Sequence, residues 1–584
     1  MIRSELVVTK KTPLAPRGLV VAEHPTGADV GAAILARGGN AIDAAVATAF
    51  AMTVVEPFMS TIGGAGTMLV HLASENETLS IDFNAVAPAA AHDGMYPLVG
   101  GGVSELFGWP RVQNDANVVG PRSIAVPGSV AGLTLALERF GTLELADVLQ
   151  PAIQLAREGF VHDWYQALTS ARFTEELAAF PESARVYLRN GRAIYRPPHL
   201  EPGDRATYPD LARSLELIAQ DGADAFYRGP IAQAIHDHMR ATGGLVTRSD
   251  LAAYSARVDT PLWGRYRDVD LAWSPGATGG ATALEILNIL EQFPAASVGG
   301  DTVEGLHLRA RAVGRAFIDR LTLLGDPAEV KVPWERLASK EYAREVAAEI
   351  RRARSRPAPV APAPKGRTGG RVPPGSARRG GGVAGRGPRA RHFAPIVPAA
   401  DCTTHIGVVD RHRNLVSLTH TAVSVFGSRM VVPGTGILLN NGMLWFDPEV
   451  RRPNSVAPRK RVLCNMTPAL GFRRGKPYLT IGAPGGRKIV SAIPQVLANL
   501  IDRRSSFQAA VEAPRLHTEG GEVLIDQRVG DKAIVALRRR GHPVSPKEET
   551  FATLFFAKPV GIRVTDKGLE AGLDHLRPAA AAGH

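Results

Sequence analysis

The chain has 584 residues, of which 45% are hydrophobic and 21% charged, so it is long enough for a globular protein with a large core. Its formal net charge of +12 comes from residues 351–391, which hold twelve basic and no acidic residues; the other 56 basic and 56 acidic residues leave no excess positive field for a nucleic-acid backbone. The chain has two cysteines, no apolar run of about 18 residues and no apolar leader. These features predict a soluble, cytoplasmic protein without nucleic-acid or membrane partners.

The first part of the chain is predicted to be mainly helical. Residues 18–25 (GLVVAEHP) are typical of a strand, and residues 28–57 have alanine-rich helical spacing interrupted by Gly38 and Gly39. Helical periodicity then recurs in five further segments, at 129–140, 145–160, 210–220, 281–293 and 304–324. This order predicts one strand followed by a series of helices.

Residues 351–402 form a tract rich in proline, glycine and arginine, and we expect it to be a disordered linker. A solvated spacer is the plain interpretation, and an RNA-binding or membrane-surface role is the alternative. Residues 351–391 lack the aromatic side chains on which single-stranded bases stack, which argues against RNA. A lineage-specific insertion or a locally shifted reading frame would give the same composition.

The part after the tract is predicted to be richer in strands. Alternating or apolar runs indicate strands at 406–410, 415–423, 478–484, 523–526 and 561–565. Helices are predicted at 488–501 and 532–541. Strands and helices mixed in this way favour a layered α/β architecture, in which residues 1–350 form the large part, 351–402 the linker and 403–584 the small part.

Several familiar signatures fail on inspection. The segment GFRRGK (471–476) is one residue short of a phosphate-binding loop, and Ser129 in GSVAG stands in the wrong place for a nucleophile elbow. His236 and His238 are two residues apart on an expected helix and therefore point to different faces. The sequence predicts no metal site and no cofactor.

Thr403 stands where the proline-rich tract ends and an alternating apolar run begins. A threonine hydroxyl is a poor nucleophile and needs an adjacent base. If the chain is cut just before Thr403, the new α-amine can act as that base, because its unperturbed pKa is about 7.7 to 8.0. The plain alternative is that the threonines 403 and 404 only begin a strand.

Two further features make chemical sense beside Thr403. Thr421 lies on the expected next strand of a hairpin, where its hydroxyl can hydrogen-bond that of Thr403. Gly485 and Gly486 lie between an expected strand and helix, where backbone N–H groups can hold the oxyanion of an acyl-transfer intermediate. Taken alone, the two glycines would be only the turn that starts a helix.

Motifs spread over nearly the whole chain resemble the γ-glutamyltranspeptidase (glutathione hydrolase) family of N-terminal-nucleophile hydrolases. They include EAPRLH, TTHIGVVD, GILLNNGM and IGAPGGRKI, together with residues 20–66, 125–143 and 226–232. The resemblance implies a four-layer αββα fold made as one precursor. It also implies a large and a small subunit that form an obligate heterodimer, with a dimer of these as a further option.

The resemblance assigns roles to the residues singled out above. The precursor would be cut between Cys402 and Thr403, and the mature Thr403 would carry the acyl group from an amide to water or an amine. Thr404 is the alternative nucleophile, but the family is cut before the first threonine of TTH. Thr421 matches the threonine that contacts the nucleophile, and glycines 485 and 486 match the oxyanion glycines.

The chain departs from the family at the positions that grip the glutamyl head group. The replacements are Asn84 for an arginine, Val423 for an asparagine, Gly442 for a glutamine, Trp445 for an acidic residue, and Cys464 with Asn465 for a serine pair. Each exchange removes a charge or a strong hydrogen-bond partner. Losing one charge-assisted contact costs about 1.5 to 3 kcal/mol, so we expect the loss of both counter-ions to lower glutathione turnover by orders of magnitude.

These departures predict an acyl donor without the glutamate α-amino group, such as a glutaryl or oxamate-like amide. A genuine glutathione hydrolase in which the exchanges are tolerated drift is the enzymatic alternative. Arg122, Arg429 or Arg487 could then compensate, but the sequence cannot place them. A hypothesis of another class is an inactive scaffold that binds through its basic linker.

Overall fold

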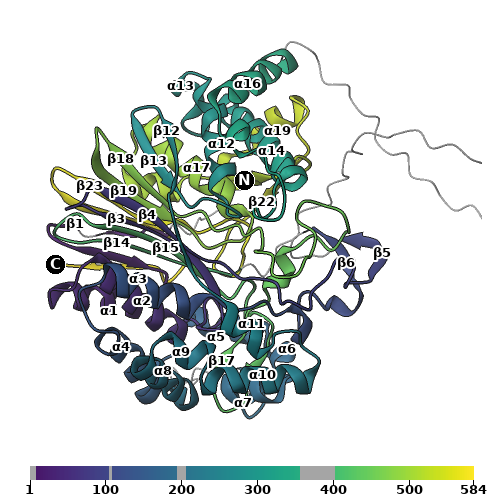
Figure 1. Cartoon of the computed structure of the whole chain (residues 1–584). Coiled ribbons are helices and arrows are strands. Elements are labelled where there is room, and N and C mark those ends of the chain that lie inside the picture. The colour runs from purple at the N-terminus through teal and green to yellow at the C-terminus, as the bar shows by residue number, and fades with distance from the viewer. Residues whose placement is uncertain (1–7, 13, 104–107, 194–204, 355–401) are drawn as a thin grey trace, which may run out of the picture.

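Two seven-stranded sheets lie face to face at the centre of the molecule (Figure 1). The computed structural model describes residues 8–12, 14–103, 108–193, 205–354 and 402–584. The first sheet has the strand order β11 (Arg257–Asp259), β4 (Glu77–Phe83), β3 (Ala65–Leu72), β15 (Leu415–Thr421), β14 (Thr404–Val409), β2 (Leu19–Ala22), β25 (Ala580–Gly583). The second has the order β1 (Leu14–Ala15), β24 (Gly568–Leu573), β23 (Val560–Thr565), β19 (Lys476–Gly482), β18 (Ala469–Arg473), β13 (Val269–Trp273), β12 (Leu262–Tyr266).

Helices cover the outer face of each sheet, which gives four αββα layers (Figure 1). Against the first sheet pack α1 (Pro25–Ala36), α2 (Ala41–Val55) and α3 (Ser129–Phe140), with α4 (Leu145–Glu158) and α8 (Pro209–Asp221) beyond them. Against the second lie α12 (Gly280–Glu291), α17 (Lys488–Ile501) and α18 (Phe507–Glu512), with α14 (Val303–Leu323) and α16 (Lys340–Arg354) outside. The expected four-layer fold is therefore confirmed.

Smaller elements surround these layers. The remaining helices are α5 (Trp164–Arg172), α6 (Thr174–Ala178), α7 (Pro181–Tyr187), α9 (Ala223–Tyr227), α10 (Pro230–Thr242), α11 (Arg248–Ala253), α13 (Ala295–Val298), α15 (Trp334–Leu337) and α19 (Asp531–Arg539). The remaining strands are β5 (Leu98–Val103), β6 (Pro110–Val112), β7 (Phe160–Val161), β8 (Leu188–Arg189), β9 (Arg192–Ala193), β10 (Arg205–Ala206), β16 (Val431–Val432), β17 (Ile437–Leu438), β20 (Leu516–Thr518), β21 (Val523–Asp526) and β22 (Val544–Lys547). No helix within the described ranges is long and apolar enough to cross a membrane.

The break between α1 and α2 follows from local chemistry. Gly38 has φ 99°, a left-handed conformation that ends α1 without steric strain. Asn40 then caps α2: its side chain accepts from the backbone N–H of Asp43, whose carboxylate accepts from the backbone N–H of Asn40. Just after α2, the Met59 carbonyl oxygen accepts from the Cys402 thiol and from the N–H of Ala422, on either side of the hairpin β14–β15.

The expected linker begins later than the composition predicts. Residues 351–354 are the last turn of α16 and not disordered, because Val346 and Ile350 of that helix pack into an apolar cluster with the second sheet. Basic side chains also suit the carboxyl end of a helix, where the helix dipole is negative. Cys402, at the other end of the expected linker, is buried. Residues 355–401 lie outside the described residues.

Candidate active site at Thr403

Thr403 lies directly before strand β14 of the first sheet. The hydroxyl of Thr403 donates a hydrogen bond to the carbonyl oxygen of Cys402. The thiol of Cys402 donates to the carbonyl oxygen of Met59 at 3.3 Å, which holds this end of the expected linker in place. The expected nucleophile is thus held against the peptide bond that it is expected to attack.

Thr421 ends the neighbouring strand β15, as the hairpin register requires. Its Oγ1 lies 3.2 Å from that of Thr403, so the predicted contact between the two hydroxyls is confirmed. The Thr421 hydroxyl donates to the Cys402 carbonyl oxygen at 3.0 Å and accepts from the N–H of Val423 at 2.8 Å. This hydroxyl therefore polarises the carbonyl group of the expected scissile bond.

The neighbouring residues of the TTH motif have a different environment. Thr404 is fully buried, and its hydroxyl makes no hydrogen bond with any residue that the structure describes. His405 Nδ1 lies 2.9 Å from Thr419 Oγ1, and burial lowers the pKa of His405 to about 3. His405 is therefore a neutral structural side chain. Thr403 is favoured over Thr404 as nucleophile, because the Thr403 hydroxyl contacts the Cys402 carbonyl group and the Thr404 hydroxyl contacts no described polar group.

Gly485 and Gly486 form the turn between β19 and α17. Their φ angles are 134° and 56°, which glycine adopts readily and other residues rarely do. A Cβ atom on Gly485 would lie 2.5 Å from the Cα atom of Ala557, so the close backbone approach also requires glycine. Within the described chain neither N–H group donates a hydrogen bond, and Gly485 lines the same cavity as Thr403. The N–H group of Gly485 is thus available for an oxyanion, and that of Gly486 follows it directly in the turn.

The six positions at which the chain departs from the family are all buried around one apolar cluster. On one side, the Asn84 amide donates to the carbonyl oxygen of Val462 at 2.8 Å. The buried guanidinium of Arg320 donates to Cys464 O at 2.5 Å and to Asn465 Oδ1 at 3.1 Å. Burial also raises the pKa of the Cys464 thiol to about 12. The side chains of Asn84 and Asn465 are therefore neutral and already engaged with the protein, and the Cys464 thiol is neutral.

On the other side of the cluster lie Val423, Gly442 and Trp445. A Cβ atom on Gly442 would lie 2.8 Å from Ala125 Cβ, so the glutamine usual in the family does not fit here. Val423 has φ 86°, a conformation that asparagine tolerates better than a β-branched residue. The indole N–H of Trp445 has no partner among the described residues. None of these three side chains offers a counter-ion to an ammonium group.

The three arginines that could compensate lie in different places. Arg122 is exposed, and Arg429 is engaged by Glu176 at 2.8 Å. Arg487 follows the two turn glycines directly; its guanidinium lies 4.4 Å from the centre of the Trp109 ring, which belongs to the apolar cluster. It also pairs with Glu519 at 2.8 Å. Of the three, Arg487 is the cation beside the expected acyl pocket.

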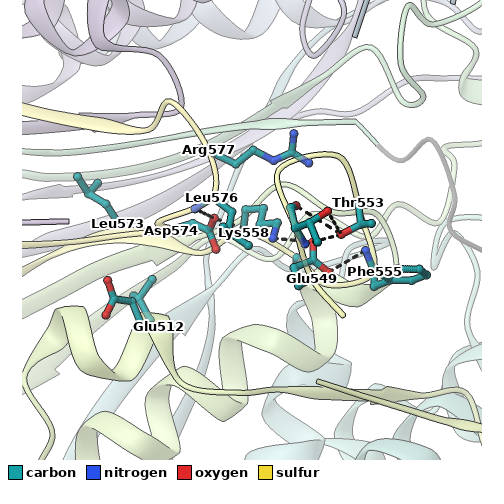
Figure 2. Close-up of polar contacts among 12 residues, drawn as sticks. Glu512, Glu549, Thr553, Phe555, Lys558, Leu573, Asp574, Leu576 and Arg577 are labelled. Atoms are coloured by element: carbon teal, nitrogen blue, oxygen red, sulfur yellow. Dashed lines mark hydrogen bonds and ion pairs between the residues drawn. The ribbon is translucent and has the colours of Figure 1, made fainter. Parts of the chain in front are cut away.

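Sequence reasoning missed a charged cavity beside Thr403. The cavity is small and leaves room for about one water molecule. Its charged or hydroxyl-bearing walls, besides Thr403, are Glu23, Glu56, Tyr165, Lys558 and Arg577. Figure 2 shows part of this wall, in which Lys558 pairs with Glu549 at 2.7 Å and lies near Asp574. The sequence did hold a signal for this cavity, because Glu23 and Glu56 stand as acidic residues inside the apolar runs VVAEHP and TVVEPF.

Burial raises the pKa of both acids of this cavity. That of Glu56 rises to about 8, with Asp163 adding to the effect and Arg577 opposing it. That of Glu23 rises well above its ordinary value for the same reason, with a further contribution from Glu56. No group of three or more His, Cys, Asp or Glu side chains within the described ranges could hold a metal ion.

Comparison with known proteins bears on this site. A family profile described as gamma-glutamyltranspeptidase matches residues 27–584. The "Acylase ACY 1 proenzyme" of Pseudomonas sp. (strain SE83) is 39% identical over 545 residues, covering 93% of this chain and 89% of the relative. The "Glutathione hydrolase proenzyme" of Escherichia coli (strain K12) is 33% identical over 554 residues, covering 92% and 88%. The crystal structure of cephalosporin acylase from Bacillus halodurans superposes with a TM-score of 0.81 at 25% identity, covering 100% of this chain and 98% of that one.

Proposed function

The chain belongs to the γ-glutamyltranspeptidase family and is an N-terminal-nucleophile acyl hydrolase, and we propose that Thr403 is its nucleophile after self-cleavage at Cys402. The observation that carries this proposal is the position of the Thr403 hydroxyl. It lies against the Cys402 carbonyl group and within 3.2 Å of the Thr421 hydroxyl. Relatives named proenzymes support the same maturation.

Maturation proceeds through an ester. The Thr403 oxygen attacks the carbonyl carbon of Cys402, the C–N bond breaks, and the nitrogen takes up the hydroxyl proton. Water then hydrolyses the ester, which leaves a carboxylate on Cys402 and a free α-amine on Thr403. The products are fragments 1–402 and 403–584, which remain together as one heterodimer, with a dimer of heterodimers as the proposed higher state. Cys402 and Cys464 are buried and not joined by a disulfide, which suits the cytoplasm, where we place the enzyme.

The mature enzyme transfers an acyl group. The α-amine of Thr403 accepts the hydroxyl proton, the oxygen attacks the amide carbonyl of the donor, and the amine product leaves with that proton. The N–H groups of Gly485 and Gly486 stabilise the oxyanion, which typically contributes 10²- to 10³-fold to kcat per donor. Water or a second amine then releases the acyl group.

The donor is an amide whose acyl group lacks the glutamate α-amino group, such as a glutaryl or oxamate-like amide. The apolar surroundings of Trp445 and Val423 support this, because an ammonium group buried there would lose its hydration without gaining a partner. The higher identity to the relative named acylase than to the one named glutathione hydrolase agrees with this choice.

A comparison of donors tests the acyl preference. Purified protein is assayed on glutathione and γ-glutamyl anilide beside glutaryl anilide and oxamate. We expect kcat/KM for both γ-glutamyl donors to lie at least tenfold below that for the best donor, from the loss of one charge-assisted contact of about 1.5 kcal/mol or more. A rate on glutathione within tenfold of the best donor would restore the glutathione hydrolase alternative.

A denaturing gel separates the enzyme from an inactive scaffold. Spontaneous appearance of fragments 1–402 and 403–584, abolished in Thr403→Ala, supports the enzyme. An intact chain that binds RNA in a salt-dependent way supports the scaffold. The hydroxyl contacts of Thr403 favour the enzyme, since a scaffold does not require them.

A further inference from the structure

A second cavity lies on the outer side of the second sheet and shares no wall with the one beside Thr403. It measures about 480 Å³, within the range of about 300 to 1,000 Å³ that is usual for small-molecule sites. The neighbouring helices α14 and α16 form one side of it (Figure 1). The turn between β20 and β21 and the segment 541–543 form the other side. The cavity therefore lies between parts of the chain that precede the expected cut and parts that follow it.

One part of the cavity wall is apolar. Val346 and Ile350 of α16 and Val523 of β21 line it and also belong to the apolar core on this side of the second sheet. Ile318 of α14 and Pro543 continue the same wall. Apolar surface that a ligand removes from water stabilises the bound state. This wall therefore suits the hydrocarbon part of a ligand.

The charged groups of the cavity leave one cation unpaired. Arg315 pairs with Asp319 at 2.9 Å and with Glu349 at 3.3 Å, so the charges of Arg315 and Glu349 offset each other. Arg311 lies four residues earlier on α14, and its side chain is exposed. It forms no hydrogen bond or ion pair with any residue that the structure describes. An anion in the cavity would supply the missing partner of Arg311.

A pair of histidines lies within electrostatic reach of Arg311. His307 Nδ1 lies 2.8 Å from His542 Nε2, so these two atoms share one hydrogen. His542 lines the cavity, and its Nδ1 has no partner in the described part of the chain. Burial lowers the pKa of His307 to about 4 and that of His542 to about 3, and the charge of Arg311 adds to both effects. Both rings are therefore neutral near pH 7, and when His307 donates within the pair, the Nδ1–H group of His542 is a free donor.

We propose that this cavity binds a monocarboxylic acid with an apolar chain, as in a medium-chain fatty acid. The carboxylate pairs with Arg311 and accepts from the Nδ1–H group of His542, and the chain lies along Val346 and Ile350. One unpaired cation suits one negative charge, whereas a phosphate group brings a charge of about −1.5 to −2. The proposal goes beyond the acyl transfer, because the ligand contacts neither the nucleophile nor the oxyanion turn.

Calorimetry with three matched ligands tests the assignment. Octanoate has both the chain and the carboxylate, 1-octanol has only the chain, and acetate has only the carboxylate. We expect octanoate to bind the native protein at least about tenfold more tightly than either partial ligand. In Arg311→Gln we expect octanoate to bind at least about fivefold more weakly and octanol to bind as before. Arg344→Gln is the matched control, because Arg344 is an exposed arginine of α16 that does not line the cavity.

Covering the cavity shows where octanoate binds. Ala353 of α16 is exposed at the edge of the cavity, and both native cysteines are buried. We expect Ala353→Cys labelled with N-ethylmaleimide to lose octanoate binding, and Arg344→Cys labelled in the same way to keep it. Octanoate at saturation should also slow the labelling of Ala353→Cys and leave that of Arg344→Cys unchanged.

Two results would overturn the assignment. One is octanol binding as tight as octanoate binding, and the other is octanoate binding that neither Arg311→Gln nor the label at position 353 weakens. Since Arg311 is exposed, an unchanged Tm of Arg311→Gln shows that its loss of binding is not a folding defect. The full chain serves in every arm, and the cavity is present in the uncut chain. Failure of the proposed function therefore leaves this test intact.

Discussion

At the scale of single residues, self-cleavage by the Thr403 hydroxyl depends on an uncharged neighbour, the hydroxyl of Thr421. In the uncut chain Thr403 has no α-amine, and the nearby His405 is engaged by Thr419. The Thr421 hydroxyl, by contrast, donates to the Cys402 carbonyl oxygen at 3.0 Å and makes its carbon more electrophilic. Activation of the carbonyl group rather than of the nucleophile is thus what this geometry offers to self-cleavage.

Replacing Thr421 by valine tests this role. Valine has nearly the same shape but lacks the hydroxyl, so the carbonyl loses a hydrogen bond that strengthens as the oxyanion develops. Loss of about 1.5 to 3 kcal/mol predicts cleavage that is about 10- to 100-fold slower. The appearance of fragment 403–584 on denaturing gels gives the rate. Thr421→Ser, which keeps the hydroxyl, should cleave at close to the native rate, and equal rates for valine and serine would remove Thr421 from the mechanism.

Glu56 makes the stability of the fold depend on pH. Its pKa is about 8 in the folded protein against an ordinary value of 4.5. Between these pH values the unfolded carboxyl is ionised and the folded one protonated, so folding takes up a proton and stability falls as pH rises. Glu56→Gln removes this penalty. We expect Tm of the variant to equal the native Tm near pH 4.5 and to exceed it by about 3 °C at pH 8.5.

The control for this experiment is the exposed Glu75, whose replacement by glutamine should leave the pH dependence of Tm unchanged. Glu23 shifts in the same direction as Glu56, so a smaller slope remains in the single variant. Parallel melting profiles of the native protein and Glu56→Gln across this pH range would mean that the Glu56 carboxyl is ionised in the folded protein.

At the scale of elements, the site is predictable where its parts are close in sequence. The alternating runs before and after the turn at 410–414 predicted a hairpin, and its register brings Thr421 beside Thr403. The strand, glycine pair and helix around Gly485 were predicted in the same way. The charged cavity was not, because it unites the ends of β2 and α2 with the C-terminal segment, which only tertiary packing brings together. Periodicity also missed the short helices α5 to α7, which are too brief to show a pattern.

The turn between β19 and α17 leads to a prediction about glycine. Gly485→Ala places a Cβ atom against Ala557 in a backbone conformation that alanine rarely adopts, so the N–H groups of the turn move. We expect kcat to fall by about 10²- to 10³-fold, as for loss of an oxyanion donor. Gly475→Ala is the matched control: its φ of 72° is also left-handed, but no atom lies within 4 Å of the added Cβ. A similar loss of kcat in both variants would show that strain, and not the oxyanion turn, is responsible.

At the scale of the whole molecule, residues from both sides of the expected cut are interleaved in both sheets. In the first sheet, β14 and β15 lie between β2 and β3. In the second, β24, β23, β19 and β18 lie between β1 and β13. Strands that precede the cut therefore flank strands that follow it. Cleavage between 402 and 403 breaks one peptide bond but none of these strand pairings. Both sheets therefore remain built from strands of both fragments.

This interleaving predicts that the two fragments stay together without a covalent link. After complete cleavage, fragments 1–402 and 403–584 should elute as one species in size-exclusion chromatography, even at high salt, because backbone pairing and apolar packing are not screened by ions. They should separate only in denaturant concentrations that also abolish the circular dichroism of the sheets. The uncut Thr403→Ala protein is the control and should elute at the same volume. Dissociation of the fragments in dilute native buffer would contradict the interleaved sheets.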